Sequence, residues 1–90
     1  MRDPSEAIKT SENTVDLRGM IADEAIDATD AFLDSALQRN WNVVFVLHGH
    51  GTGALKSAIR TYLEESDYVD DFRPGGKNQG GDGITVVWLR

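Results

Sequence analysis

An apolar run that passes directly into a glycine-rich turn restricts the possible folds of this chain more than any other segment. Residues 43–47, Val-Val-Phe-Val-Leu, have the β-branched and aromatic composition of a strand that is buried on both faces. Residues 48–53 follow at once as His-Gly-His-Gly-Thr-Gly, and apolar side chains then recur at helical spacing from Leu55 to Leu63. A buried strand, a tight turn and an amphipathic helix in this order are typical of a parallel α/β unit.

The remaining segments supply three more strands and a second helix. Residues 14–18 alternate apolar and polar side chains, which predicts a short strand with one covered face, and apolar spacing predicts a helix over 22–37. A weaker, partly polar strand follows at 68–73, then a glycine-rich loop at 74–83 and a mostly apolar strand at 84–89. The predicted order of elements is βαβαββ.

Charge separates the central strands from the edge strands. The segments 43–47 and 84–89 are apolar on both faces and should be central, whereas 14–18 and 68–73 carry charges that suit the edges. We therefore predict an α/β fold, an α+β two-layer sandwich whose mixed four-stranded sheet has the order 1-2-4-3, with the last strand antiparallel to the others. Right-handed crossovers place both helices on one face. The second face stays apolar and partly open, which suggests cover by a tail or a partner.

Composition limits the class of protein and its partners. The chain has 90 residues, enough for one domain, and we expect a flexible polar tail over 1–12 and a folded unit over 13–90. It has no cysteine, which fits a cytoplasmic location, and its longest apolar run is too short to span a membrane. The net charge is −6, and because phosphate neutralisation dominates nucleic-acid affinity, any contact with nucleic acid has to use a local basic patch.

Polar side chains end the first two predicted strands. Asp16 and Arg18 lie at the end of the first strand, and His48 follows the second. Because ligands of open α/β sheets bind beyond the carboxyl ends of parallel strands, we expect these three side chains to share one crevice. Each also has a simpler interpretation, Asp16 and Arg18 as a mutual surface ion pair and His48 as a hydrogen-bonded histidine. Their coincidence at one crevice favours a site.

The glycine turn, residues 48–53, has the chemistry of an anion site. Its alternate glycines leave backbone N–H groups free to converge at the start of the next helix, where Thr52 or Gly53 is the expected cap. The spacing matches neither the P-loop nor the dinucleotide-binding fingerprint, so a tight connection without a ligand is the alternative. The predicted phosphate- or nucleic-acid-binding residues are Gly49, His50, Gly51, Thr52, Gly53, Lys56, Arg60 and Lys77.

Three motifs in this order resemble the small MutS-related (Smr) domain. They are Val-Asp-Leu-Arg-Gly at 15–19, the turn at 48–53, and Phe72 followed by Gly-Gly-Asp-Gly-Ile-Thr at 80–85. The resemblance extends over residues 14–89 and implies a fold similar to the C-terminal domain of translation initiation factor three. It also implies a nuclease or nucleic-acid-binding role.

Smaller features resemble one branch of that family. Arg18, Arg-Pro-Gly at 73–75 and Gly-Asp-Gly at 81–83 are similar to the C-terminal Smr domain of MutS-like ATPases that lack mismatch repair. This resemblance implies fusion to an ATPase domain in a longer protein, and a part in recombination control or in the rescue of stalled ribosomes.

Two functions are compatible with these residues. In the first, the domain is an endonuclease that cuts or nicks RNA or DNA, with Asp16 or His48 as general base or acid and Arg18 holding the scissile phosphate. We expect no cofactor and no metal, because metal-dependent nucleases display several carboxylates and only Asp16 is well placed. In the second, the domain is a non-catalytic module that binds nucleic acid or a ribosome. Arg18 cannot titrate, and His50 stands where the family often has lysine, so both favour binding over cutting.

Overall fold

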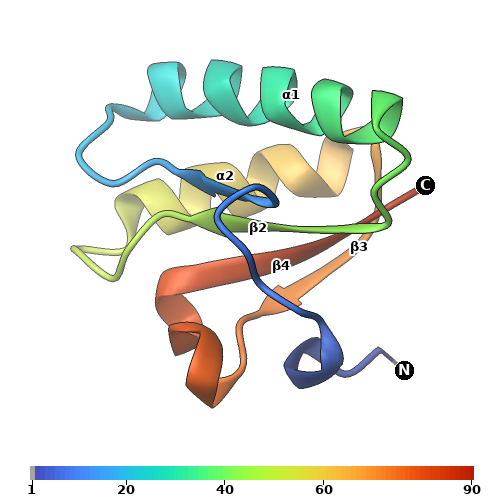
Figure 1. Cartoon of the computed structure of the whole chain (residues 1–90). Helices are drawn as coiled ribbons and strands as arrows, with labels where there is room; N and C mark the ends of the chain where they lie inside the picture. Colours follow the sequence, from blue (N-terminus) through green and yellow to red (C-terminus); the bar gives the residue numbers. More distant parts are fainter. Residues whose placement is uncertain (1) are drawn as a thin grey trace.

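Two helices lie on one face of a four-stranded sheet and form the two layers of the domain (Figure 1). The computed structural model describes residues 2–90. The helices are α1 (Ala22–Gln38) and α2 (Ala54–Glu65), and the strands are β1 (Thr14–Asp16), β2 (Val43–Leu47), β3 (Val69–Pro74) and β4 (Ile84–Leu89). Short 3-10 helices are η1 (Pro4–Glu6), η2 (Lys77–Gln79) and η3 (Gly81–Gly83). The predicted fold class and the βαβαββ order are confirmed.

The sheet has the strand order β1-β2-β4-β3. β1 runs parallel to β2, and β4 runs antiparallel to both β2 and β3, which confirms the predicted order and the reversed last strand. β1 is shorter than predicted and ends at Asp16. The chain turns there because Gly19 takes a φ of +84° and the N–H of Met20 donates to the carbonyl of Leu17 at 3.0 Å.

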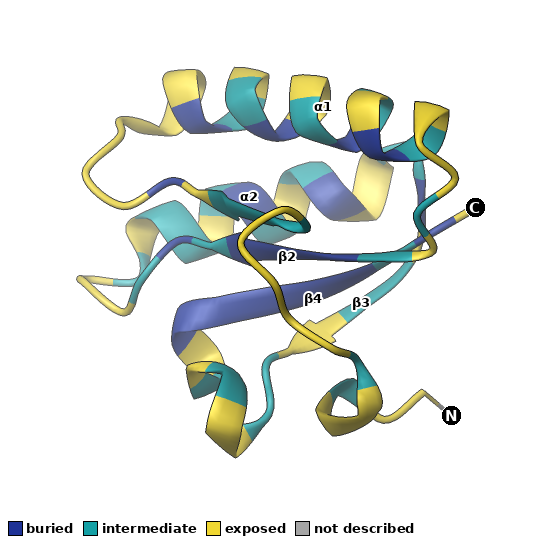
Figure 2. Ribbon diagram, viewed as in Figure 1, coloured by how far each residue is buried: buried dark blue, intermediate teal, exposed yellow. Residues whose placement is uncertain are grey.

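The main core lies between the helices and the sheet. Its helical members recur at intervals of three or four positions and comprise Ala25, Thr29, Leu33 and Ala36 of α1 with Ile59 and Leu63 of α2. Figure 2 shows these buried stripes facing the sheet and the exposed residues facing outward. The packing holds both helix N-termini at one edge of the sheet, beyond the carboxyl ends of β1 and β2. Across residues 2–90, no helix is long and apolar enough to cross a membrane.

The chain's own N-terminal segment covers the second face of the sheet. The buried residues on that face are Phe45, Ile84 and Val86. Ala7 and Trp88 pack against them, and the side-chain amide of Gln79 donates to the carbonyls of Pro4 at 2.7 Å and Ala7 at 2.8 Å. In Figure 1 this segment crosses in front of β2 and β4. A tail thus supplies the cover that the open apolar face required, while the domain boundary at residue 13 stays a prediction.

Candidate nucleic-acid interface

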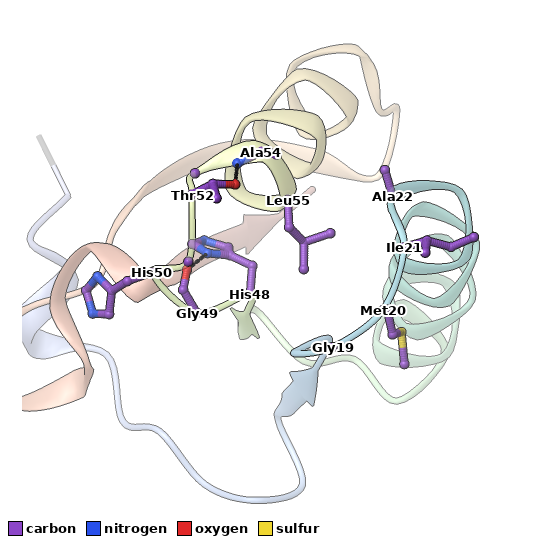
Figure 3. Close-up of a pocket in the computed structure, with 12 residues that line it drawn as sticks. Gly19, Met20, Ile21, Ala22, His48, Gly49, His50, Thr52, Ala54 and Leu55 are labelled. Carbon is purple, nitrogen blue, oxygen red and sulfur yellow. Dashed lines mark hydrogen bonds between the residues drawn. The ribbon is translucent and has the colours of Figure 1, made fainter.

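An open cleft of about 450 Å³ lies at the edge of the sheet where both helices begin (Figure 3). Its walls are the segment 19–22 that leads from β1 into α1, the glycine turn, and the first residues of α2, Ala54 and Leu55. The N-terminus of a helix carries a partial positive charge, and two such ends line this cleft. One wall is apolar at the surface, since Ile21 is 66% exposed and Met20 lies beside it. The cleft lies at the sheet edge where a ligand site was predicted, but of the three side chains expected to share it only His48 is among its lining residues, and Asp16 and Arg18 are not.

The glycine turn lines the cleft and leaves several of its backbone N–H groups unpaired within residues 2–90. Gly49, Gly51 and Gly53 take φ values of +80°, +43° and +87°, which side-chain-bearing residues rarely adopt. Gly53 is the N-cap of α2, and the Thr52 hydroxyl lies 3.4 Å from the first helical N–H. The N–H groups of residues 50–52 have no hydrogen-bond acceptor among residues 2–90. The turn therefore keeps donors available for an anion at the start of a helix.

Asp16 and Arg18 form a bidentate ion pair beside this turn. Nε of Arg18 donates to Oδ1 of Asp16 at 3.0 Å, and Nη2 donates to Oδ2 at 2.8 Å. These hydrogen bonds lower the pKa of Asp16 to about 2. The aliphatic part of Arg18 lies against Gly49, where an added Cβ would sit 3.3 Å from Cγ of the arginine. The pair is the mutual ion pair that the sequence allowed, and it also lies next to the predicted anion site.

His48 is turned inward and is only 5% exposed. Its Nδ1 lies 2.9 Å from the carbonyl oxygen of Gly49, and its Nε2 lies 2.8 Å from the hydroxyl of Thr85. Because a carbonyl only accepts, Nδ1 carries the proton and Nε2 accepts from Thr85. Burial lowers the pKa of His48, so the ring is neutral near pH 7. Both nitrogens are engaged within the protein, an arrangement that orients the turn and leaves no ring atom free for a ligand.

The predicted basic residues of α2 point toward the loop after β3. Lys56 forms an ion pair with Asp82 of η3, and Nη2 of Arg60 lies 3.0 Å from the same carboxylate. Nε of Arg60 donates to the Thr85 hydroxyl at 3.0 Å, which links α2 to the His48 ring. Lys77 begins η2 and does not line the cleft. Lys56 and Arg60 are thus brought together with each other but not with Arg18.

The ring of His50 rests on the backbone of Gly83. A Cβ added at Gly83 would lie 2.8 Å from Nε2 of His50, so any larger residue there would push this exposed ring aside. The carbonyl of Gly83 also accepts from the N–H of Gly49 at 2.8 Å. In Figure 3 His50 points to the side of the turn away from Gly19 and Met20. The loop 80–83 and the glycine turn therefore form one continuous surface.

Comparison with known proteins decides the family. Residues 15–90 match the family model of the Smr domain. The chain belongs to the Smr domain family. Two relatives, each named Endonuclease MutS2, come from Clostridium acetobutylicum, with 42% identity over 83 residues, and Fusobacterium nucleatum, with 45% identity over 76 residues. These matches cover 92% and 84% of this chain but 10% of each relative, so the Smr domain spans about a tenth of their length.

Solved structures share the fold of this Smr domain. The crystal structure of the Smr domain of Thermus thermophilus MutS2 matches with a TM-score of 0.85 and 41% identity, covering 87% of this chain and 98% of that chain. YdaL, a stand-alone small MutS-related protein from Escherichia coli, matches with a TM-score of 0.86 over 92% of this chain and 68% of its own, at 22% identity. The resemblance that the three motifs indicated is confirmed.

Sequence reasoning missed two residues that organise the Smr domain's site. Thr85 is completely buried and bridges Arg60 to His48, and Asp82 neutralises both cations of α2. The signal for Thr85 was a polar residue inside an otherwise apolar strand. The signal for Asp82 was a single acid between two glycines. Among residues 2–90 no cluster of three or more His, Asp or Glu side chains could hold a metal ion.

Proposed function

We propose that this Smr domain binds the phosphate backbone of a nucleic acid at the cleft. The observation that carries the proposal is the set of unpaired N–H groups at 50–52, at the start of α2, in a turn against which the aliphatic part of Arg18 packs. Such N–H groups bind the non-bridging oxygens of a phosphate, and the dipole of α2 adds to the attraction.

Arg18 keeps donors for a ligand while Asp16 holds it in place. A guanidinium has five N–H groups, and the Asp16 pair uses only those on Nε and Nη2. The exposed pair can therefore contact a phosphate without losing its internal partner. The apolar side chains of Met20 and Ile21, which line the cleft across from the glycine turn, provide a surface for the sugar or the base. A nucleotide has both kinds of surface, which favours it over a simple inorganic anion.

A second candidate function is phosphodiester cleavage, which the names of the MutS2 relatives favour. Asp16 and His48 are the titratable groups at the strand ends. Asp16 is a weak base because its pKa is about 2, and His48 would have to give up its contact with Gly49 or Thr85 to exchange a proton. We therefore place binding first and cleavage second. RNA and DNA are both candidate ligands.

The larger setting is also a proposal. Because the relatives are about ten times longer than this chain, we infer that the domain acts within a MutS-like protein that carries an ATPase domain. Its setting would be the cytoplasm, and structured RNA of a stalled ribosome or a recombination intermediate would be its target.

The test measures binding of a labelled single-stranded RNA and of a DNA of the same sequence by fluorescence anisotropy. Arg18→Met should weaken binding about tenfold, since an arginine–phosphate contact is lost. Arg39→Met is the matched control, because Arg39 lies at the far end of α1 and contacts Trp41. The slope of log K against log salt should also become shallower by roughly 0.7 per lost phosphate contact. Equal affinities for the two variants would refute the proposed site.

Cleavage is tested on the same RNA with Asp16→Asn. If the domain cuts, this variant should lose cutting and still bind, because asparagine keeps an acceptor oxygen for Arg18 but lacks the carboxylate that would act on the reacting group. Cutting that survives the substitution would assign the activity to a contaminant.

A further inference from the structure

Two cations of α2 converge on one carboxylate next to the glycine turn. Lys56 and Arg60 both pair with Asp82, and the two cations hold the pKa of Asp82 below its ordinary value. Both cationic side chains are largely covered, whereas the side chain of Asp82 is 49% exposed. The cations are thus fixed parts of the fold, and the acid is the accessible member of the cluster.

The cluster has spare donor capacity. Nη2 of Arg60 is buried and lies 3.0 Å from Oδ1 of Asp82, yet within residues 2–90 it makes no well-aligned hydrogen bond. Its Nε is already committed to Thr85. A tetrahedral phosphate offers more acceptor oxygens than a carboxylate, so it can satisfy Lys56 and Nη2 of Arg60 together.

Asp82 sits on a segment that can release it. Gly80 and Gly81 take φ values of +110° and +58°, and η3 is a single turn in which Asp82 is exposed and Gly83 is buried. The segment touches the glycine turn through the Gly83 carbonyl and the His50 ring. A phosphate at Lys56 and Arg60 would therefore lie on the same surface as a phosphate at the turn.

We propose that Lys56 and Arg60 form a second phosphate subsite, that Asp82 occupies it in the free domain, and that a phosphate of the bound strand displaces Asp82. The inference rests on the proposed function and extends it from one phosphate to at least two along the same strand. Asp82 acts as an internal competitor, since its carboxylate pairs with the same two cations that the phosphate would contact. It lowers the affinity for nucleic acid and rejects ligands too short to reach both subsites.

The test compares Asp82→Asn with Asp67→Asn, because both remove one negative charge and Asp67 is exposed on the connection between α2 and β3. With a labelled single-stranded RNA, Asp82→Asn should bind roughly 3- to 10-fold tighter than Asp67→Asn. The reason is that RNA binding to the wild type has to break the two partly exposed ion pairs of Asp82, and this cost is absent in Asp82→Asn. In a Lys56→Met background, this gain should shrink, because one of the two released cations is gone. Thermal melts of each variant confirm that the compared proteins are folded.

The outcomes separate this inference from the proposed function. If the wild type and Asp67→Asn bind no nucleic acid, the proposed function fails. If they bind and Asp82→Asn gains no more than Asp67→Asn, or gains equally with and without Lys56, Asp82 is only a structural partner and the second subsite is refuted. If Asp82→Asn melts much lower, Asp82→Ser in the same comparison has to show the gain or the inference is rejected.

Discussion

Replacing Thr85 with valine tests the hydrogen-bond chain that fixes the glycine turn. Thr85 is completely buried, accepts from Nε of Arg60 at 3.0 Å and donates to Nε2 of His48 at 2.8 Å. Valine has nearly the same shape but no hydroxyl. Thr85→Val therefore leaves a buried acceptor on His48 and a donor on Arg60 without partners, and it adds no cavity.

The size of the effect follows from those two lost partners. An unsatisfied buried polar group costs about 1–3 kcal/mol. Because Arg60 keeps some access to solvent, the cost of its lost hydrogen bond lies near the lower limit of that range. We expect Thr85→Val to lower the free energy of unfolding by about 2–4 kcal/mol. Thr85→Ser keeps the hydroxyl and loses one buried methyl group, which costs about 1 kcal/mol.

Urea unfolding at pH 7.5, followed by circular dichroism, measures both variants. Valine should destabilise the domain more than serine, although valine is the more hydrophobic residue. A valine variant as stable as the serine variant would refute the hydrogen-bond chain as the support of the turn. The imidazole resonances of His48 give a second reading, since its ring environment should change in the valine variant and not in the serine variant.

Three further predictions concern protonation and the N-terminal segment. Stability should fall as the pH drops below about 6.5, because burial lowers the pKa of His48 in the folded state while the unfolded chain takes up the proton; urea unfolding at several pH values measures this. The carboxyl ¹³C resonance of Asp16 should titrate near pH 2, and Arg18→Met should move its pKa up toward the ordinary value; an unchanged titration would contradict the ion pair. Gln79→Ala removes both side-chain bonds to the N-terminal segment and should speed limited proteolysis within residues 2–12 without loss of the folded core. Equal cleavage rates would show that this amide does not hold the segment.

The sheet could be predicted because burial and charge differ strongly among its strands. An all-apolar segment at 43–47 has to be central, and charged segments have to lie at edges. Helical spacing and right-handed crossovers then leave one arrangement of the helices. The sequence left open which face Phe45 and Trp88 occupy, since a strand that is apolar on both faces has no alternation of polar and apolar residues to mark the solvent side. The pairing of Phe45 with Val86 places both aromatic residues on the face opposite the helices.

The site was only partly predictable. The ends of neighbouring parallel strands must meet, so the approach of Arg18 to the glycine turn followed from topology. The direction of the α2 cations did not follow, because Lys56 and Arg60 can turn toward either side of the helix and their partner Asp82 lies 26 and 22 positions away in a loop. The inward turn of His48 depends on Thr85, a contact across 37 positions that no local pattern reveals.

A titration followed by amide NMR spectra tests the central claim most directly. The ¹⁵N-labelled domain is titrated with a short single-stranded RNA at low salt, and each backbone amide is monitored. We predict the largest shifts at the N–H groups of 50–52 and at the side-chain Nε of Arg18, with residues 40–42 at the opposite edge of the sheet unchanged. Shifts confined to the opposite edge, or saturable binding with no change at 50–52, would contradict the claim that the glycine turn binds phosphate.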